Sequence, residues 1–459
     1  MNQNHTPAGN PLGNAPVGSL LRKFAIPSII SMVVNALYNI VDQIFIGQGV
    51  GMLGNAATNV AFPMTTVVLA VSLLLGIGGA SNFNLALGRQ QTERARQIAG
   101  TAFGSLALFG ILLFVVIRGF LEPIVLACGA TEQTLEYSLA YVSITSFGFP
   151  FAMLTTGGCH LIRADGKPTY SMVATLSGAI INTILDPLFI FVFGWGIEGA
   201  AWATVAGQFF SACMILRYLP KYLNGSLKVR DFIPRMDSLR AIISLGCASC
   251  LNQLALTVVQ ILMNNILRHY GSLSVYGSDI PLAVVGIVSK INMLFLAVVI
   301  GLSQGAQPII SFNYGAKNYS RVKEAYLKAA GLSTIIAVTA TLIFELFPHT
   351  IISIFGNGDE LYYKFAVKFI RVFLFCTFFN GIQPVTANFF SSIGKAAKGI
   401  FLSMTRQLLF LVPLVVLLPL LMGVEGVMFA GPVADAAAGI LGILLMYREL
   451  KNMTSPTQG

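Results

Sequence analysis

Long apolar runs separated by short polar stretches dominate the chain from residue 22 onward. Runs of about 20 apolar residues are long enough to cross the hydrocarbon core of a bilayer as α-helices. Short segments of alternating hydrophobicity, which are typical of a transmembrane β-barrel, do not dominate the pattern. The chain is therefore predicted to be an all-α polytopic membrane protein with twelve transmembrane helices, near residues 22–47, 57–84, 97–120, 137–159, 170–194, 198–220, 240–270, 282–312, 323–347, 364–391, 398–421 and 425–447.

Composition supports this class. Hydrophobic residues make up 55% of the 459 residues and charged residues only 10%, whereas soluble domains carry about 25% charged residues. The first twenty residues are polar and lack the charged-then-apolar layout of a cleaved signal peptide. We therefore expect the first apolar segment to act as an uncleaved insertion signal.

The positive charges are distributed unevenly between the two sets of loops. If the N-terminus is inside and the loops alternate, 21 of the 28 Lys and Arg residues lie inside and five lie outside. Lys290 and Arg406 fall within apolar segments. This excess predicts that both termini are cytoplasmic. The net charge of +10 then reflects membrane orientation, and no nucleic-acid partner is expected.

The chain also repeats itself at a spacing of about 227 residues. Six helices per repeat give both halves the same orientation, as in transporters with parallel repeats. We expect a tail at 1–21, an N-terminal lobe at 22–220, a cytoplasmic linker at 221–239, a C-terminal lobe at 240–449 and a tail at 450–459. A duplicated channel or structural protein is the alternative. The matching residues are Leu87-Gly88 and Arg94 with Tyr314-Gly315 and Arg321, Gly166-Lys167 with Gly394-Lys395, and residues 196–199 with 423–426.

The fifth apolar segment contains a carboxylate, Asp186, in the run Asn182-Thr183-Ile184-Leu185-Asp186-Pro187. An ionisable residue in such a segment is expensive to bury, so it indicates a functional site. Asn182 lies one turn earlier on the same helix face. Pro187 cannot donate to the helix ladder, which frees the carbonyl of Thr183 and makes Pro187 a candidate hinge. These oxygen ligands suit Na⁺ or a proton relay.

Two other helices of the predicted N-terminal lobe carry polar residues at a similar depth. Asp42 in the first segment, Asp186 and Thr204 in the sixth segment all lie roughly 8–12 Å below the outer surface at ~1.5 Å per residue. Thr204 alone is explained more simply as a contact between helices, and the carboxylates favour function.

The first segment carries further polar residues. Asn35 and Asn39 share a helix face with Asp42, and Tyr38 lies in the same run. The two amides fit helix packing and function equally well. Pro27, lower in this segment, offers a place for the helix to bend.

The run Leu37-Tyr38-Asn39-Ile40-Val41-Asp42, the run ending in Pro187, the run Gly199-Ala200-Ala201-Trp202-Ala203-Thr204 and the repeat together resemble the multidrug and toxic compound extrusion (MATE) family. The resemblance covers nearly the whole chain and is strongest to prokaryotic members with a cation site in the N-terminal lobe. It implies multidrug efflux, that is, export of amphipathic or cationic compounds by antiport with Na⁺ or H⁺, from a bacterial inner membrane. It also implies that Asp42, Asn182, Asp186 and Thr204 form the coupling-ion site.

The C-terminal half departs from another branch of that family, which has a carboxylate in the seventh segment. Here that segment offers Gln253 and Gln260, which argues against a cation site of that type. Lys290, Arg406 and Asp435 lie within segments 8, 11 and 12. They can pair with one another as structural charges or take part in transport.

Several other functions find no support. The chain has no G-x-x-x-x-G-K-[ST] nucleotide loop, no H-E-x-x-H and no nucleophile-elbow serine, so neither ATP use nor an enzyme is expected. Cys247 and Cys250 lie inside a predicted spanning helix, where they act as small hydrophobic residues. A flippase for a lipid-linked precursor remains the alternative transporter, although only Lys290 and Arg406 could hold a phosphate inside the membrane. A membrane scaffold would not need paired carboxylates. We expect a monomer surrounded by membrane lipids, with no cofactor beyond the coupling ion.

Overall fold

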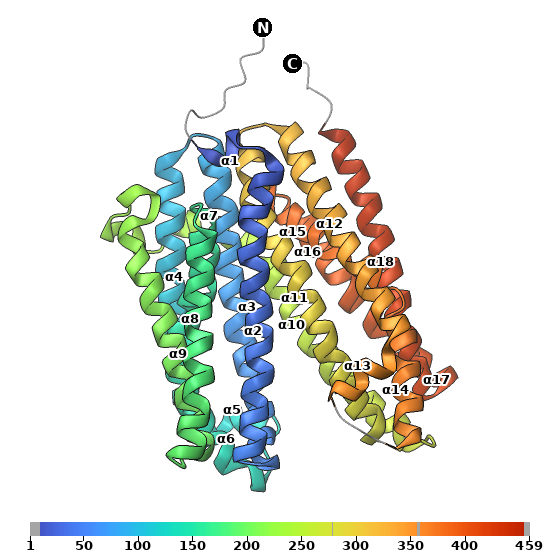
Figure 1. Cartoon of the computed structure of the whole chain (residues 1–459). Helices are drawn as coiled ribbons and strands as arrows, with labels where there is room; N and C mark the ends of the chain where they lie inside the picture. The colour runs from blue at the N-terminus through green and yellow to red at the C-terminus, as the bar shows by residue number, and fades with distance from the viewer. Residues whose placement is uncertain (1–9, 278, 356–358, 454–459) are drawn as a thin grey trace.

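The computed structural model describes residues 10–277, 279–355 and 359–453. Parts of both predicted tails, 1–9 and 454–459, lie outside the described residues. The described chain folds into helices joined by short turns (Figure 1). In chain order these are α1 (Pro11–Asn14), α2 (Val17–Gly49), α3 (Met52–Gly88), α4 (Thr92–Gly119), α5 (Leu121–Ala127), α6 (Glu132–Thr145), η1 (Ser146–Gly148), α7 (Phe149–Ala164), α8 (Pro168–Pro187), η2 (Leu188–Val192), α9 (Gly196–Tyr218), η3 (Leu219–Gly225), η4 (Val229–Phe232), α10 (Met236–Ser272), α11 (Asp279–Gly315), α12 (Tyr319–Leu346), α13 (Pro348–Phe355), α14 (Glu360–Phe373), η5 (Thr377–Gly381), α15 (Gln383–Ser392), α16 (Ala396–Met404), η6 (Thr405–Leu411), α17 (Val412–Met422) and α18 (Val424–Asn452).

Eleven helical stretches in the described chain are long and apolar enough to cross a membrane. A twelfth span forms if α14 and the η5–α15 segment, which meet at a bend of 54°, are counted as one. The polytopic all-α prediction is therefore confirmed. Most helices extend a few residues beyond the predicted apolar runs. For example, α2 starts at Val17 rather than near residue 22, because Val17, Leu20 and Leu21 pack into a hydrophobic core and extend the helix by about one turn.

Buried side chains form two hydrophobic cores. One core joins α3, α4, α6, α7 and α9, with Phe83, Phe103 and Met153 at its centre. The other joins α10–α18 and also takes in Leu20 and Phe24 from the first turns of α2. We call α2–α9 the N-terminal half and α10–α18 the C-terminal half. Helix α2 therefore bridges the two, since its first turns pack into the core of the opposite half.

The two halves touch backbone to backbone along a seam between α3 and the helices α10 and α11. A Cβ placed on Gly88 would lie 2.0 Å from the carbonyl oxygen of Phe312, and one on Gly315 would lie 2.3 Å from that of Leu85. Gly88 and Gly315 occupy the same place in the repeat, so the two contacts are reciprocal. Only glycine allows helices to approach this closely.

Polar side chains reinforce the seam. Arg163 Nη1 donates to Gln304 Oε1 at 2.8 Å, and Gln307 Nε2 donates to Ser81 Oγ at 2.7 Å. Both bonds are buried and each connects the two halves. Hydrogen bonds made away from water hold a closed arrangement together, because breaking them without a substitute leaves buried polar groups unpaired.

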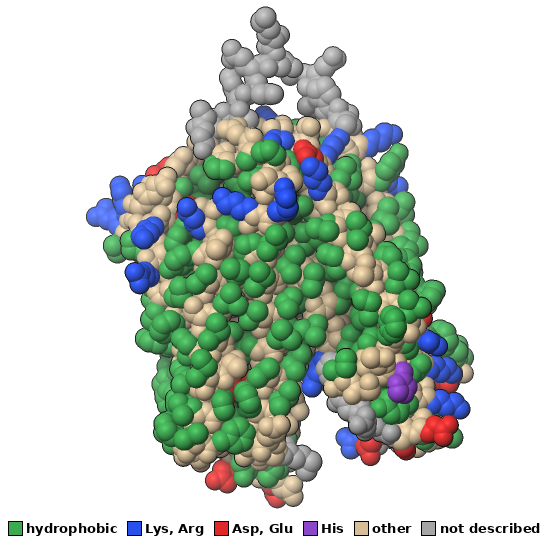
Figure 2. All heavy atoms as spheres, viewed as in Figure 1, with side chains coloured by type: hydrophobic (Ala, Val, Ile, Leu, Met, Phe, Trp, Pro, Cys, Tyr) green, Lys and Arg blue, Asp and Glu red, His purple; other side chains and the backbone are tan. Residues whose placement is uncertain are grey.

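The seam lies at one end of the molecule. The helices converge at the end where α1 lies and diverge toward the opposite end (Figure 1). Lys and Arg side chains gather at the convergent end, whereas a notch separates the two halves at the other end (Figure 2). Hydrophobic side chains cover the surface between these ends (Figure 2). The structure is thus closed on the strongly basic side and open on the other.

The stretch that joins the halves is folded against α4. Asp231, buried in this stretch, accepts a hydrogen bond from the backbone N–H of Lys228 and lies 3.1 Å from Nε of Arg96. Gly100 leaves room for the Asp231 backbone, since a Cβ there would lie 2.3 Å from its carbonyl oxygen. The region predicted as a polar linker therefore packs onto the N-terminal half, and only residues 233–235 separate it from α10.

Candidate cation-binding site

Four of the residues singled out in the sequence come together where α2, α8 and α9 meet. Asp42 projects from α2, Asn182 and Asp186 from α8, and Thr204 from α9. Asp186 is fully buried, and Asn182 and Thr204 are 2% and 9% exposed. The notch-side half of α2 and the end of α8 therefore enclose two carboxylates.

Close contact between α8 and α9 brings these side chains into register. A Cβ on Gly178 would lie 2.7 Å from the carbonyl oxygen of Gly207, and one on Gly207 would lie 2.6 Å from that of Gly178. These glycines lie about one turn before Asn182 and one turn after Thr204. The small-residue crossing sets the separation at which the amide and the hydroxyl can meet.

The carboxyl groups of Asp42 and Asp186 lie close enough to act on each other electrostatically. Two carboxylates this close repel each other unless a proton or a cation lies between them. Among the described residues, no Lys, Arg or His side chain forms an ion pair with either one. The site therefore lacks a positive charge of its own.

The remaining hydrogen bonds are long and incomplete. Asn182 Nδ2 donates to Thr204 Oγ1 at 3.3 Å and to Asp186 Oδ1 at 3.5 Å, the upper limit for such a bond. Asp42 Oδ1, Asn182 Oδ1 and Asp186 Oδ2 are buried and have no hydrogen-bond partner in the described part of the chain. Buried oxygens without partners are rare in folded proteins and indicate a bound water or ion.

This donor set fits a monovalent cation or a proton. Carboxylate, amide and hydroxyl oxygens are the hard ligands that alkali and alkaline-earth cations prefer. Pro187 adds a further oxygen nearby, because it leaves the carbonyl of Thr183 without its helical donor. Directly after Pro187 the chain forms a π-helical turn, η2, a distortion that is frequent at functional sites.

Two tyrosines complete the site, and one of them was missed in the sequence. Tyr38, one turn before Asp42, lies close to both carboxylates. Tyr141 on α6 is buried near the same carboxylates and near Thr204. A tyrosine inside an apolar segment carries no pattern that separates it from a core residue, so only the packing of α6 on α9 reveals Tyr141.

Other sequence candidates lie elsewhere. Asn35 and Asn39 are exposed on α2, and the side chain of Asn39 donates to the backbone carbonyl of Asn35 at 2.6 Å. Gln260 on α10 is half-buried, donates to Asn264 and accepts a hydrogen bond from Ser289. These hydrogen-bond partners lie outside the carboxylate cluster.

A separate charged group lies inside the C-terminal half. Arg406 Nε contacts Asp435 Oδ1 at 2.6 Å, and Asn380 Nδ2 donates to Asp435 Oδ2 at 2.9 Å. Asp435 is 2% exposed and both of its oxygens are occupied. Here a guanidinium fills the place that a free cation could take, which fits the structural interpretation of this pair. Lys290 is not part of this group.

Pro27 lies inside α2, which runs as one helix from Val17 to Gly49. The proline leaves the carbonyl of Lys23 without its helical donor. One turn later, the hydroxyl of Ser31 donates to the carbonyl of Pro27 at 2.8 Å. The helix is therefore weakened between the seam and Asp42, which keeps Pro27 a candidate bend point.

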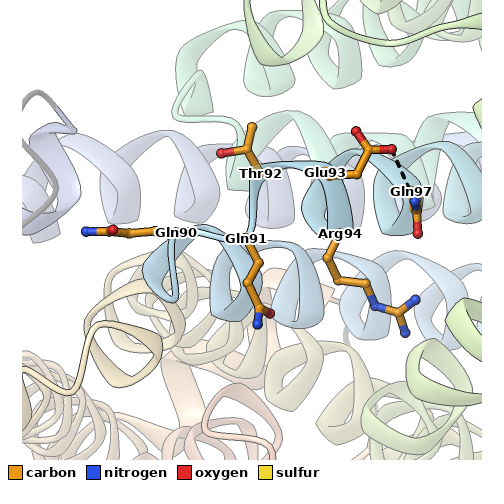
Figure 3. A pocket seen from close by; sticks show the side chains of 6 residues that line it. All are labelled: Gln90, Gln91, Thr92, Glu93, Arg94 and Gln97. Carbon is orange, nitrogen blue, oxygen red and sulfur yellow. Dashed lines mark hydrogen bonds between the residues drawn. The ribbon is translucent and has the colours of Figure 1, made fainter.

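A surface depression near the α3–α4 turn is not part of this site. It is lined by Gln90, Gln91, Thr92, Glu93, Arg94 and Gln97 (Figure 3). It is wide open, and it lies at the opposite end of α3 from the notch. Two of its side chains bond to each other, since Gln97 donates to Glu93 at 3.2 Å (Figure 3), and Arg94 donates to Ser238 at the start of α10.

Comparison with known proteins identifies the family. The chain matches the MatE family over residues 27–188 and 248–417. Multidrug export protein MepA of Staphylococcus haemolyticus is 25% identical over 94% of this chain and 93% of its own length. MepA of Staphylococcus aureus is 24% identical over 96% of each chain. A solved structure described as the outward-facing conformation of a multidrug resistance MATE family transporter of the MOP superfamily superposes with a TM-score of 0.90 at 22% identity, covering 98% of this chain and 100% of that one. The chain is therefore a member of the MATE family of membrane transporters, which are not enzymes.

Proposed function

We propose that this protein is a secondary active multidrug exporter, which moves amphipathic and cationic compounds out of the cell in exchange for Na⁺ or H⁺. The observation that carries the proposal is the pair of carboxylates, the half-buried Asp42 and the buried Asp186, with no basic partner among the described residues. Family membership and the similarity to multidrug export proteins support it.

The distribution of charge supports an orientation. The basic, closed end corresponds to the cytoplasmic side under the positive-inside rule, which puts both chain ends in the cytoplasm. The notch then opens to the outside (Figure 2). Residues 22–220 and 240–449 would act as two lobes that rock about the seam. We further infer a monomer in a bacterial plasma membrane.

In this proposal the unpartnered oxygens of Asp42, Asn182 and Asp186, with the hydroxyl of Thr204, hold the coupling ion. Ion binding removes the repulsion between the two carboxylates and draws α2 toward α8. A ligand shifts a conformational equilibrium only by its differential affinity for the two states. The site must therefore bind the ion more tightly in one lobe arrangement than in the other.

Transport in proteoliposomes with Na⁺ and pH gradients applied separately tests this function. We expect efflux of a cationic dye to depend on one or both gradients in the wild type and to lose that dependence in Asp186→Asn. Glu122→Gln is the matched control, because it neutralises an exposed carboxylate near the same membrane face. Gradient-dependent efflux that is equal in all three proteins would contradict the assignment of the site. No efflux by the wild type under either gradient would contradict the function.

A further inference from the structure

Lys290 is an ionisable residue within a predicted membrane span that the proposed coupling mechanism does not use. It is half-buried in α11, about eleven residues from the helix start at Asp279. It forms no hydrogen bond or ion pair with any residue that the structure describes, in contrast to Arg406. A charged side chain at membrane depth is costly, so its retention without a partner indicates a functional role.

The helix face that carries Lys290 is directed toward the N-terminal half. Gly301 and Gly305 of α11 touch α2 directly, because a Cβ on either one would lie 2.6 Å from Cα of Ile29 or 2.5 Å from Cα of Ala25. Lys290 precedes Gly301 by eleven residues, about three helical turns. Residues at this spacing share one face of a helix. Lys290 therefore projects from α11 on the side that faces α2.

At the level of Lys290 this face of α11 is open. Met293 is 41% exposed and Ala283 is also exposed. A Cβ on Gly286, one turn from Lys290, would meet nothing within 4 Å. The helices diverge toward the notch (Figures 1 and 2). Lys290 thus lies in the wall of the opening between the two halves.

The ammonium and the carboxylate pair lie at similar depth. From the contact between Gly301 and Ile29, Lys290 is eleven residues and Asp42 is thirteen residues toward the open end, or roughly 16 and 20 Å at ~1.5 Å per residue. A lysine side chain reaches only about 6 Å. Lys290 lies eleven residues, or roughly 16 Å at ~1.5 Å per residue, from the start of α11 at Asp279, so its side chain cannot carry the charge to that end of the helix. The charge must therefore be hydrated through the opening.

We propose that Lys290 binds the anionic group of zwitterionic substrates, which are amphipathic organic cations that also carry a carboxylate. The proposal rests on the exporter function above and names a substrate class for it. Lys290 lies in one wall of the opening, and α2, which carries Asp42 on its side toward α8, forms part of the opposite wall. A substrate in the opening can therefore bring its carboxylate to Lys290 while the rest of the molecule contacts the opposite wall. Charge-assisted contacts of this kind are the stronger class of hydrogen bonds. Substrates without a carboxylate use the N-terminal wall only.

A matched pair of dyes tests the proposal, namely a rhodamine methyl ester, which is cationic, and the corresponding free acid, which is zwitterionic. Binding to the purified protein and efflux from proteoliposomes are measured for both dyes. In Lys290→Met we expect the affinity for the free acid to fall about tenfold, the size of one charged hydrogen bond, while the affinity for the ester stays within twofold. Lys290→Arg should retain most of the preference for the acid. Lys364→Met, which removes an exposed charge from α14, should behave as wild type.

The two dyes separate the two proposals. If the wild type exports the ester but neither binds nor exports the acid, the role of Lys290 is overturned and the exporter function stays intact. Equal losses for both dyes in Lys290→Met would also overturn it, because they would assign Lys290 to folding or coupling. Failure of the wild type to export either dye would overturn the exporter function itself and the substrate class that rests on it.

Discussion

The substitution Gly88→Ala, which adds one methyl group, should destabilise the closed arrangement at the basic end of the molecule. The added Cβ would lie 2.0 Å from the carbonyl oxygen of Phe312, whereas ordinary contacts begin near 3.4 Å. The backbone of α3 must therefore move away from α11 by about 1.4 Å. Such overpacking costs roughly 1–3 kcal/mol in a well-packed interior. In the arrangement that is open at the basic end the same methyl group costs little, so the equilibrium should shift toward that arrangement by a factor of about 5 to 150.

The labelling rate of a cysteine buried in the seam measures this shift. Ser81→Cys, in a protein whose six native cysteines are replaced, places a thiol where the side chain is fully buried. Adding Gly88→Ala should raise its reaction rate with a water-soluble maleimide at the basic end by a factor in that range. Gly315→Ala should act in the same direction, since its Cβ would lie 2.3 Å from the carbonyl oxygen of Leu85.

Gly331→Ala is the matched control, because its Cβ would meet nothing within 4 Å. Gly88→Ala and Gly315→Ala disrupt the same contact surface. The increase in labelling rate in the double variant should therefore be smaller than the product of the increases in the two single variants. Equal labelling of the Gly88 and Gly331 variants would refute the view that the glycine seam holds this end closed.

Three further predictions follow from the charged groups. Asp42→Asn and Asp186→Asn should each abolish ion-coupled dye efflux with normal yields of folded protein. Added Na⁺ or acid should weaken dye binding to the wild type but not to Asp42→Asn. Normal efflux by both variants would exclude the two carboxylates from the coupling mechanism. Arg406→Met should lower the stability in detergent by about 3–5 kcal/mol, because it strands the buried Asp435 carboxylate, and Asp435→Asn added to it should restore most of the loss in a thermal unfolding assay. Burial raises the pKa of Asp165, outside the spans, from 3.8 to about 6, against a hydrogen bond from the Tyr218 hydroxyl. The folded state therefore holds a proton more tightly than the unfolded chain, and the stabilisation present below about pH 4 is lost as pH rises through 6; Asp165→Asn should flatten the dependence of Tm on pH in this range.

The spans and the polar residues at one depth could be predicted because both follow from local sequence. Twenty apolar residues define a membrane helix, and a rise of about 1.5 Å per residue converts position into depth. Asp42, Asp186 and Thr204 were therefore expected at one level before their contacts were known. The positions of Arg406 and Asp435 in neighbouring segments likewise suggested the pair that the structure contains.

Features that depend on rotation between helices could not be predicted. Tyr141 enters the cluster only because α6 packs on α9 with that face inward. Lys290 was grouped with Arg406 and Asp435 as a candidate structural charge or transport residue, but it lies on α11 and takes no part in their pairing. Gly88 and Gly315 appeared only as repeat markers, because a glycine shows its tight contact only when the opposing backbone is present.

The folded connection between the halves acts as a short tether. Its anchor is η4, which is held to α4 through Asp231 and Arg96, so the free length is only residues 233–235 before α10 begins at Met236. At no more than ~3.5 Å per residue, this piece of chain spans about 14 Å when fully stretched. The basic end can therefore tilt or slide open within that distance, but the halves cannot separate further there. Inserting flexible residues after Phe232 would lengthen the tether without touching the transport pathway, and so would show how much of the motion is limited by its length.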